Sequence, residues 1–188
     1  MVRDAEASRR RILRAATAEF AAYGIAGARM DRVAAQAESS KERVYAYFGN
    51  KDALFDAVFT ASVGRTLDAV SFDAGDLPAY AGRMFDYFAD HPDQQRLTTW
   101  YRLERPTGPG LRAVIEANRS RLEALTAAQE SGRLAPTFSP VALLTLIQAM
   151  ASSWGTMNPE FGEAATSADR PTRRQAVIDA VHRLITTN

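Results

Sequence analysis

Hydrophobic residues recur along this chain at the three- and four-residue spacing of a helix face, and no stretch alternates apolar and polar residues like a half-buried strand. Near the N-terminus one such face is formed by Ile12, Leu13, Ala16 and Phe20. Gly24 follows where a glycine commonly ends a helix. The pattern predicts an all-α fold.

Start and stop signals predict about nine helices. Asp4 or Ser8 can cap the first helix, and Asn50 or Asp52 can open the long fourth one. The one plausible domain boundary falls inside or at the start of that fourth helix, and we place it between residues 1–50 and residues 51–188. The expected helices cover residues 4–23, 30–37, 41–47, 50–70, 77–89, 93–104, 110–131, 140–156 and 171–186.

Two short helices joined by a tight turn, with a longer helix before them, are typical of a helix-turn-helix. The expected inward positions are apolar: Val33 and Ala34 on the first short helix and Val44 on the second. Ala37 lies at the turn. Small residues are needed at positions 34 and 37 because the two helices cross closely there.

The second short helix is polar on its outward side. Ser40 can cap it, and its free N–H groups together with Lys41 and Arg43 form a site for phosphates and base edges. For an isolated short helix the same residues would ordinarily indicate only a solvated face. The outward residues are Ser40, Lys41, Glu42, Arg43, Tyr45 and Tyr47.

Charge is distributed unevenly, although the formal net charge is only +1. Residues 1–51 carry ten basic and six acidic side chains, and residues 52–188 carry 13 basic and 16 acidic ones. The only two lysines, Lys41 and Lys51, both lie in the basic segment. This balance indicates an anion-binding head, with nucleic acid as the obvious anion and chance clustering as the alternative.

A longer motif links these features. Its segments are Arg11-Ile-Leu-x-Ala-Ala-x-x-x-Phe20-x-x-x-Gly24, Val33-Ala34-x-x-Ala37, and Ser40-Lys-Glu-Arg-Val-Tyr45-Ala-Tyr47-Phe48-Gly-Asn-Lys51-Asp-Ala-Leu54-Phe55. Over residues 9–60 the chain resembles the TetR family of transcriptional regulators. The Tyr-x-Tyr-Phe-x-x-Lys segment is the most specific part of the match.

The resemblance implies an α-helical homodimer with a DNA-binding head, residues 1–50, and an effector-binding and dimerisation body, residues 51–188. It implies double-stranded DNA and a small-molecule effector as partners. A two-fold dimer would bind a palindromic operator with half-sites about 34–36 Å apart or a multiple of that. We expect a repressor that its ligand releases from DNA, although the sequence leaves activation open.

Carried over position by position, the resemblance assigns DNA contacts to Lys41, Glu42, Arg43, Tyr45 and Tyr47. Lys51 resembles the phosphate clamp at the start of the fourth helix.

The chain departs from the family pattern at two places. The family usually has Gly at the turn position of Glu38, where a left-handed backbone suits glycine, so Glu38 should carry strain of about 1 kcal/mol. The family commonly has Thr or Ser before the first short helix, where this chain has Ala28 and Arg29. Arg29 can bind phosphate but cannot cap, so Asp31 must offset part of the lost helix-end stabilisation.

The body contains aromatic and apolar residues that fit either a core or the lining of an effector pocket. Polar groups that could orient a ligand are Arg96, Arg102, Arg119 and Gln148. Arg119 could equally pair with Glu116 on the surface. The pocket candidates are Phe88, Trp100, Tyr101, Arg119, Leu122, Met150 and Trp154.

The last two expected helices are apolar on more than one face, which favours a subunit interface. By resemblance they would form a four-helix bundle between two chains. The interface candidates are Leu143, Leu146, Ile147, Val177, Ile178, Val181 and Leu184.

Composition excludes several other classes of function. There is no cysteine, and the two histidines, His91 and His182, lie far apart. Thiol nucleophiles and Cys-ligated metals are excluded, and we expect no metal site, no cofactor and no enzymatic activity. No apolar run reaches the roughly 20 residues that span a bilayer, and no signal peptide is recognisable, so we expect a cytoplasmic protein without a membrane partner.

Two other hypotheses remain open at this point. The chain could be an all-α small-molecule carrier or enzyme with an incidental basic head, or a purely structural dimerisation protein. No nucleophile–base pair, metal cluster or phosphate-binding glycine loop supports chemistry.

Overall fold

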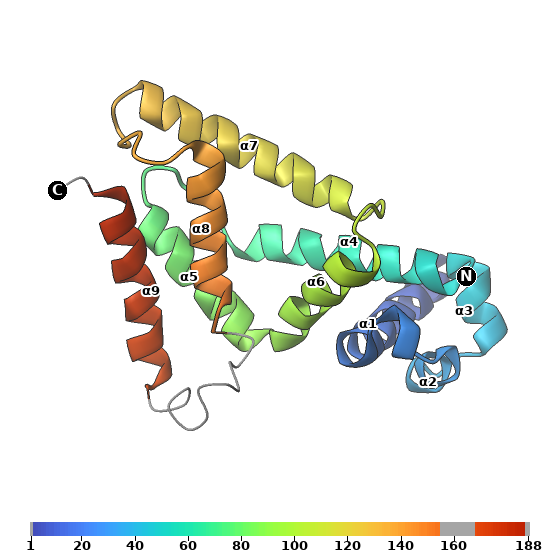
Figure 1. Ribbon diagram of the computed structural model, residues 1–188. Coiled ribbons are helices and arrows are strands. Elements are labelled where there is room, and N and C mark those ends of the chain that lie inside the picture. Colours follow the sequence, from blue (N-terminus) through green and yellow to red (C-terminus); the bar gives the residue numbers. More distant parts are fainter. Residues whose placement is uncertain (1, 155–167, 187–188) are drawn as a thin grey trace. The chain divides into compact units, whose positions relative to one another are not determined.

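The computed structural model describes residues 2–154 and 168–186, with side chains from residue 4 onward. These residues form nine α-helices and no strand, which confirms the predicted all-α fold (Figure 1). The predicted helix at 140–156 ends at residue 152, and residues 155 and 156 lie outside the described part. The helices are α1 (Val2–Gly27), α2 (Met30–Gln36), α3 (Lys41–Phe48), α4 (Lys51–Ala69), α5 (Leu77–Asp90), α6 (Pro92–Glu104), α7 (Leu111–Glu130), α8 (Pro140–Ser152) and α9 (Arg170–Ile185).

The chain divides into two compact units. The first contains residues 1–65 and 93–114, and the second contains residues 66–92 and 115–188. The first unit therefore extends beyond the domain boundary that we expected at residue 50. The reason is that α4 and α6 bury their aromatic side chains against α1.

An aromatic cluster forms the core of the first unit. The rings of Phe20 and Phe55 lie 4.8 Å apart, and Phe59 stacks on Tyr101 at 3.8 Å. All four side chains are almost fully buried. Such ring pairs add about 0.5–1.5 kcal/mol each beyond the burial of their area. The cluster holds α1, α4 and α6 together beneath the helix-turn-helix.

The Tyr101 hydroxyl ties α6 to its neighbours. It donates a hydrogen bond to Asp56 on α4 at 2.7 Å and accepts one from the Gly110 N–H at 2.8 Å. Burial, and then the bond to Asp56, raise the pKa of Tyr101 to about 12. A Cβ at Gly110 would lie 2.8 Å from Phe59 and from this hydroxyl, so only glycine fits the turn before α7.

In the second unit, α5 packs against both α8 and α9. Tyr80 and Phe85 of α5 lie in a core with Leu125 of α7 and Ile147 of α8. Asp76, Ser139 and Asp169 cap the N-termini of α5, α8 and α9 through side-chain oxygens.

Within residues 2–154 and 168–186, no helix has both the length and the apolar character of a membrane-spanning segment.

Candidate nucleic-acid interface

The helix-turn-helix forms as the sequence predicts. Val33, Ala34, Ala37 and Val44 are all buried between α2 and α3. The backbone turns between the helices at residues 37–40, where the Ser39 N–H donates to the Ala34 carbonyl at 2.9 Å. This turn directs the start of α3 toward the surface.

Glu38 adopts the left-handed backbone expected of that turn, with φ of 50°. It is the one non-glycine residue with positive φ among the described residues. The conformation costs about 1 kcal/mol where a glycine would adopt it freely. The turn therefore keeps its usual geometry, and Glu38 bears the strain that the sequence predicts.

The N-terminus of α3 is capped and charged. The Ser40 hydroxyl accepts a hydrogen bond from the Arg43 N–H at 3.2 Å, as expected. Hydrogen bonds from its own backbone N–H and from Ser40 hold the pKa of Glu42 below its usual value. The Glu42 carboxylate thus stabilises its own helix end, while Lys41 and Arg43 are exposed beside it.

Lys41 is already ion-paired across the turn. Its Nζ lies 3.0 Å from the carboxylate of Asp31 on α2. The hydrogen bond and the opposite charge lower the pKa of Asp31 and raise that of Lys41. Asp31, which we expected only to offset the uncapped end of α2, also fixes the Lys41 side chain.

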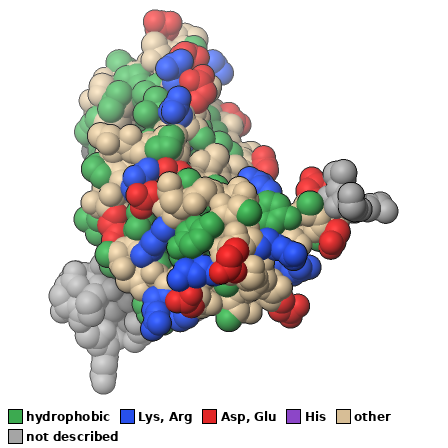
Figure 2. Space-filling view, turned by 90° about the vertical axis from the view of Figure 1, so that its right-hand side faces the viewer, with side chains coloured by type: hydrophobic (Ala, Val, Ile, Leu, Met, Phe, Trp, Pro, Cys, Tyr) green, Lys and Arg blue, Asp and Glu red, His purple; other side chains and the backbone are tan. Residues whose placement is uncertain are grey.

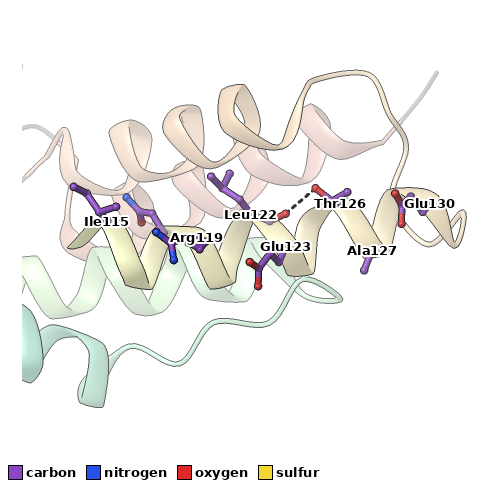
Figure 3. Close-up of a pocket in the computed structure, with 8 residues that line it drawn as sticks. Ile115, Arg119, Leu122, Glu123, Thr126, Ala127 and Glu130 are labelled. Carbon is purple, nitrogen blue, oxygen red and sulfur yellow. Dashed lines mark hydrogen bonds between the residues drawn. The ribbon is translucent and has the colours of Figure 1, made fainter. Parts of the chain in front are cut away.

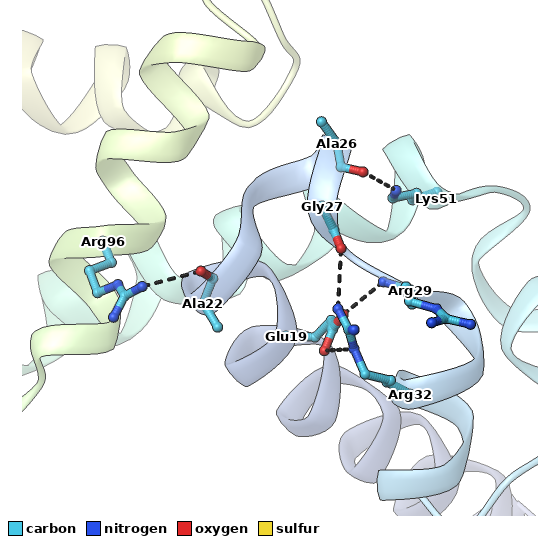
Figure 4. Close-up of polar contacts among 8 residues, drawn as sticks. All are labelled: Glu19, Ala22, Ala26, Gly27, Arg29, Arg32, Lys51 and Arg96. Atoms are coloured by element: carbon cyan, nitrogen blue, oxygen red, sulfur yellow. Dashed lines mark hydrogen bonds and ion pairs between the residues drawn. The ribbon is translucent and has the colours of Figure 1, made fainter.

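A buried carboxylate organises the other side of α2, and the sequence reasoning missed it. Glu19 of α1, 6% exposed, accepts hydrogen bonds from the Arg29 N–H at 2.7 Å and from Arg32 Nε at 2.8 Å (Figure 4). Burial acts to raise the pKa of Glu19, but the hydrogen bonds from Arg32 and Arg29 outweigh it, so the pKa is lowered. The available signal was a glutamate on the apolar face of α1, next to Ala16 and Phe20.

The Glu19 network sets the start of α2. No side chain caps this helix, as expected for Arg29 at the N-cap position. Because Glu19 fixes the Arg29 backbone, the Arg29 side chain is left exposed beside the helix end. That position suits a phosphate contact.

The remaining DNA candidates flank α3. Tyr45 and Tyr47 are half-buried and pack partly against the core of the first unit. Lys51 begins α4, and its Nζ lies 3.5 Å from the Ala26 carbonyl oxygen (Figure 4). All eight predicted DNA-binding positions therefore belong to the first unit, and none is fully buried.

Acidic and basic side chains are mixed at the surface. On the face drawn in Figure 2, Lys and Arg side chains lie among Asp and Glu side chains. The exposed pair Lys41–Asp31 is one example of such mixing.

Helix α6 fastens the end of α1. Gly24 has φ of 65° and kinks α1, and the Trp100 ring occupies the place where a Cβ would lie. The Glu104 carboxylate accepts from the Ile25 N–H at 2.5 Å, and Arg96 donates to the Ala22 carbonyl at 3.2 Å. Trp100 and Arg96, expected as pocket residues, therefore help to hold the head together.

The predicted effector residues are dispersed. Trp100 and Tyr101 belong to the first unit, while Phe88, Leu122 and Met150 pack partly buried against the core of the second. The other two, Arg119 and Trp154, line separate hollows of the second unit.

The larger hollow, about 640 Å³, runs along α7 (Figure 3). Arg119 lies in it but pairs with Glu116 at 3.1 Å on the exposed side, as the sequence allowed. The hollow is lined by Ile115, Asn118, Arg119, Leu122, Glu123, Thr126, Ala127 and Glu130.

A polar cluster inside the second unit includes one pocket candidate, Gln148. Its amide donates to Asn118 at 3.3 Å, and the Arg121 guanidinium lies over the Tyr80 ring at 5.6 Å. The Tyr80 hydroxyl is buried, and burial raises its pKa although Arg121 and Gln148 act to lower it. These groups could orient a polar ligand.

Most of the predicted interface residues are internal to the single chain. Leu143, Ile147, Val177 and Val181 are buried in the core of the second unit, because α8 and α9 direct these faces toward α5. We therefore remove them from the candidate dimer surface. Of the others, Ile178 and Leu184 are partly buried and Leu146 is 39% exposed.

The outward face of α8 is apolar at two further points. Val141 is 59% exposed, and Ala149 lies exposed one turn beyond Thr145.

Among the described residues, no group of three or more His, Asp or Glu side chains is placed to hold a metal ion.

Comparisons with known proteins agree with this architecture. Residues 12–58 match the family described as bacterial regulatory proteins, tetR family, and residues 76–183 match the tetracyclin repressor-like C-terminal domain. The chain is 36% identical to the HTH-type transcriptional repressor SCO4008 of Streptomyces coelicolor, over 96% of this chain and 98% of that one. It belongs to the TetR family of transcriptional regulators.

Solved structures show the same fold. The S. coelicolor protein SCO4942, described as a transcriptional regulator, is 42% identical and superposes with a TM-score of 0.86, covering 96% of this chain and 99% of that one. FadR of Bacillus subtilis, solved with stearoyl-CoA, shares only 17% identity. Its TM-score of 0.68, over 92% of this chain and 97% of FadR, reflects the fold alone.

Proposed function

We propose that the protein is a homodimeric repressor that binds a palindromic operator through α3 and is released by a small-molecule effector. The observation that carries the proposal is the exposed, capped N-terminus of α3 with Lys41 and Arg43 beside it. In a helix-turn-helix this part of the second helix enters the major groove. No catalytic step is assigned to the chain.

We assign the base contacts to residues in the first turn of α3. Arg43 carries a planar guanidinium that matches the paired acceptors of guanine in the major groove. Lys41 can reach the same groove once its ion pair with Asp31 breaks, or once DNA shares the lysine with that carboxylate. Glu42, bound to its own helix end, repels phosphate and would face a cytosine amino group.

We assign the phosphate contacts to residues that flank α3. Arg29, Ser40, Tyr45, Tyr47 and Lys51 surround α3 at the ends of α2, α3 and α4. Such contacts position the protein without specifying sequence.

A dimer would use the outward side of α8 and α9. Val141 and Leu146 leave apolar area on α8, and Ala176 and Ala180 are small exposed residues on α9 that allow close helix packing. A two-fold axis there would present two copies of α3 to two half-sites.

The effector would bind in the second unit. The hollow along α7 and the polar cluster around Tyr80 are the places that supply volume and polar groups. An effector releases DNA only if it binds the DNA-free conformation more tightly. Such a repressor would act in the cytoplasm, where its operator DNA lies.

A gel-shift with fragments of the source genome at 50 and 200 mM salt tests the proposal. Wild type should shift one or a few fragments, resist nonspecific competitor, and bind far more weakly at the higher salt. The double variant Lys41→Ala/Arg43→Ala should lose the shift, while Arg133→Ala, at an exposed position after α7, should keep it. A shift that the double variant retains, or the absence of a shift with wild type, would contradict the proposal.

A further inference from the structure

A small pocket in the second unit lies where α5, the end of α8 and the first turn of α9 meet. Its volume is about 150 Å³. The lining residues are Phe85, Ala89, Ala151, Trp154, Arg170 and Arg173.

The two arginines of this pocket differ in their partners. Arg170 is neutralised by Asp90 at 2.5 Å and by Asp86 at 3.4 Å. The Arg173 side chain has no hydrogen-bond or ion-pair partner within the described part of the chain, and its Nε is buried. The nearby Asp169 carboxylate accepts from the Thr172 N–H, and that hydrogen bond lowers its pKa, with a smaller contribution from the Arg173 charge.

The position of Arg173 makes this lack of a partner costly. It lies in the first turn of α9, where the free N–H groups already concentrate positive potential. A charged group with a buried, unpaired donor is destabilising unless an anion joins it. Among the described residues, the pocket therefore holds a cation whose Nε has no hydrogen-bond partner and whose charge is offset only through space by Asp169.

The walls indicate what such an anion would carry. Phe85, Ala89 and Ala151 are apolar, and the Trp154 ring lies 5.9 Å from the Arg173 guanidinium. In other proteins a cavity of about 150 Å³ accepts one benzene ring. A guanidinium binds a carboxylate through two parallel hydrogen bonds.

We propose that this pocket binds a small carboxylate attached to a single ring or a short apolar chain. The carboxylate pairs with Arg173, and the apolar part lies against Phe85 and Trp154. The site does not depend on DNA binding, so it stands or falls separately from the proposed repressor function.

Benzoate is the probe, and benzamide is its neutral control of the same shape. The chain has two tryptophans, so Trp100→Phe leaves Trp154 as the sole indole reporter. Benzoate should change its fluorescence saturably and raise Tm, whereas benzamide should do neither. Calorimetric titration of the unaltered chain measures the same affinity without the Trp100 substitution.

Arg173→Gln should weaken benzoate binding at least tenfold, and Arg183→Gln, at an exposed position on the same helix, should leave it unchanged. Without ligand, Arg173→Gln should keep or raise Tm, because an unpaired charge is removed. A loss of Tm would assign Arg173 to holding the fold and overturn the proposal. An equal response to benzamide or to chloride, or full binding by Arg173→Gln, would also overturn it.

Discussion

Asp31 holds Lys41 in an ion pair of 3.0 Å across the turn of the helix-turn-helix. The lysine assigned to the operator therefore has a competing partner on the preceding helix. DNA must either replace the carboxylate or share the lysine with it. Asp31 also adds negative charge beside the expected phosphate path, which should weaken the proposed binding to unrelated DNA.

Asp31→Asn should tighten binding to unrelated DNA severalfold at low salt. The gain should shrink as salt rises, because both side chains are exposed and screened. Fluorescence anisotropy at two salt concentrations measures it, with Asp68→Asn, exposed in the second unit, as the matched control. Weaker binding by Asp31→Asn would mean that Asp31 orients Lys41 for contact instead.

Glu19→Gln should lower the free energy of unfolding by about 1–2 kcal/mol. The change removes the negative charge and replaces one accepting oxygen by an NH2 donor that would face Arg32, and the half-exposed Arg32 limits the loss. Urea unfolding measures it, with Glu116→Gln at an exposed pair as control. A double-mutant cycle with Arg32→Gln should show coupling, and additive effects would contradict the assigned pair.

The same pair predicts a pH dependence. Because the pKa of Glu19 is lowered by folding from its ordinary value of 4.5, its contribution to stability is present above that pH and is lost as the pH falls through the folded value. Wild type should lose more stability than Glu19→Gln between neutral pH and about pH 4. If the free energy of unfolding falls equally with pH in wild type and in Glu19→Gln, Glu19 is not the cause of the pH dependence.

Lys51→Ala should weaken binding to operator and to unrelated DNA by similar factors. A phosphate contact carries no base information, and its loss should reduce the salt slope by about one unit. Titrations of both DNAs over a salt series measure this. A changed sequence preference with unchanged affinity would show that Lys51 is not a phosphate contact.

Leu146→Glu should dissociate the proposed dimer and abolish operator binding while the monomer stays folded. The side chain is exposed on α8, so a charge there disturbs only a surface that another chain would cover. Sedimentation measures the mass, and Leu103→Glu, an exposed leucine of α6, is the control. An unchanged dimer would place the interface elsewhere.

The helices and the turn were predictable because they depend on local signals. Ser40 caps α3, as its place before the helix predicts, and Glu38 takes the left-handed backbone that the resemblance to the family implies for the turn. The Glu19–Arg32 and Asp31–Lys41 pairs were not predicted, because a sequence does not say which charged side chains meet across two helices.

The interface residues show a second limit. An apolar face on α8 can be covered by the same chain or by another one, and hydrophobic periodicity is the same in both cases. Leu143 and Ile147 are covered by their own chain, whereas Leu146 is not. Trp100 likewise fits a pocket by its chemistry but packs on the kink at Gly24.

The central claim is that α3 reads base edges with Arg43. Selection of binding sites from a random DNA pool, with wild type and Arg43→Ala in parallel, tests it most directly. Wild type should select a palindrome whose half-sites lie about 34–36 Å apart or a multiple of that, and Arg43→Ala should lose preference at one G·C position per half-site with about tenfold weaker binding. The same palindrome with uniformly lower affinity, or no selected sequence at all, would contradict the claim.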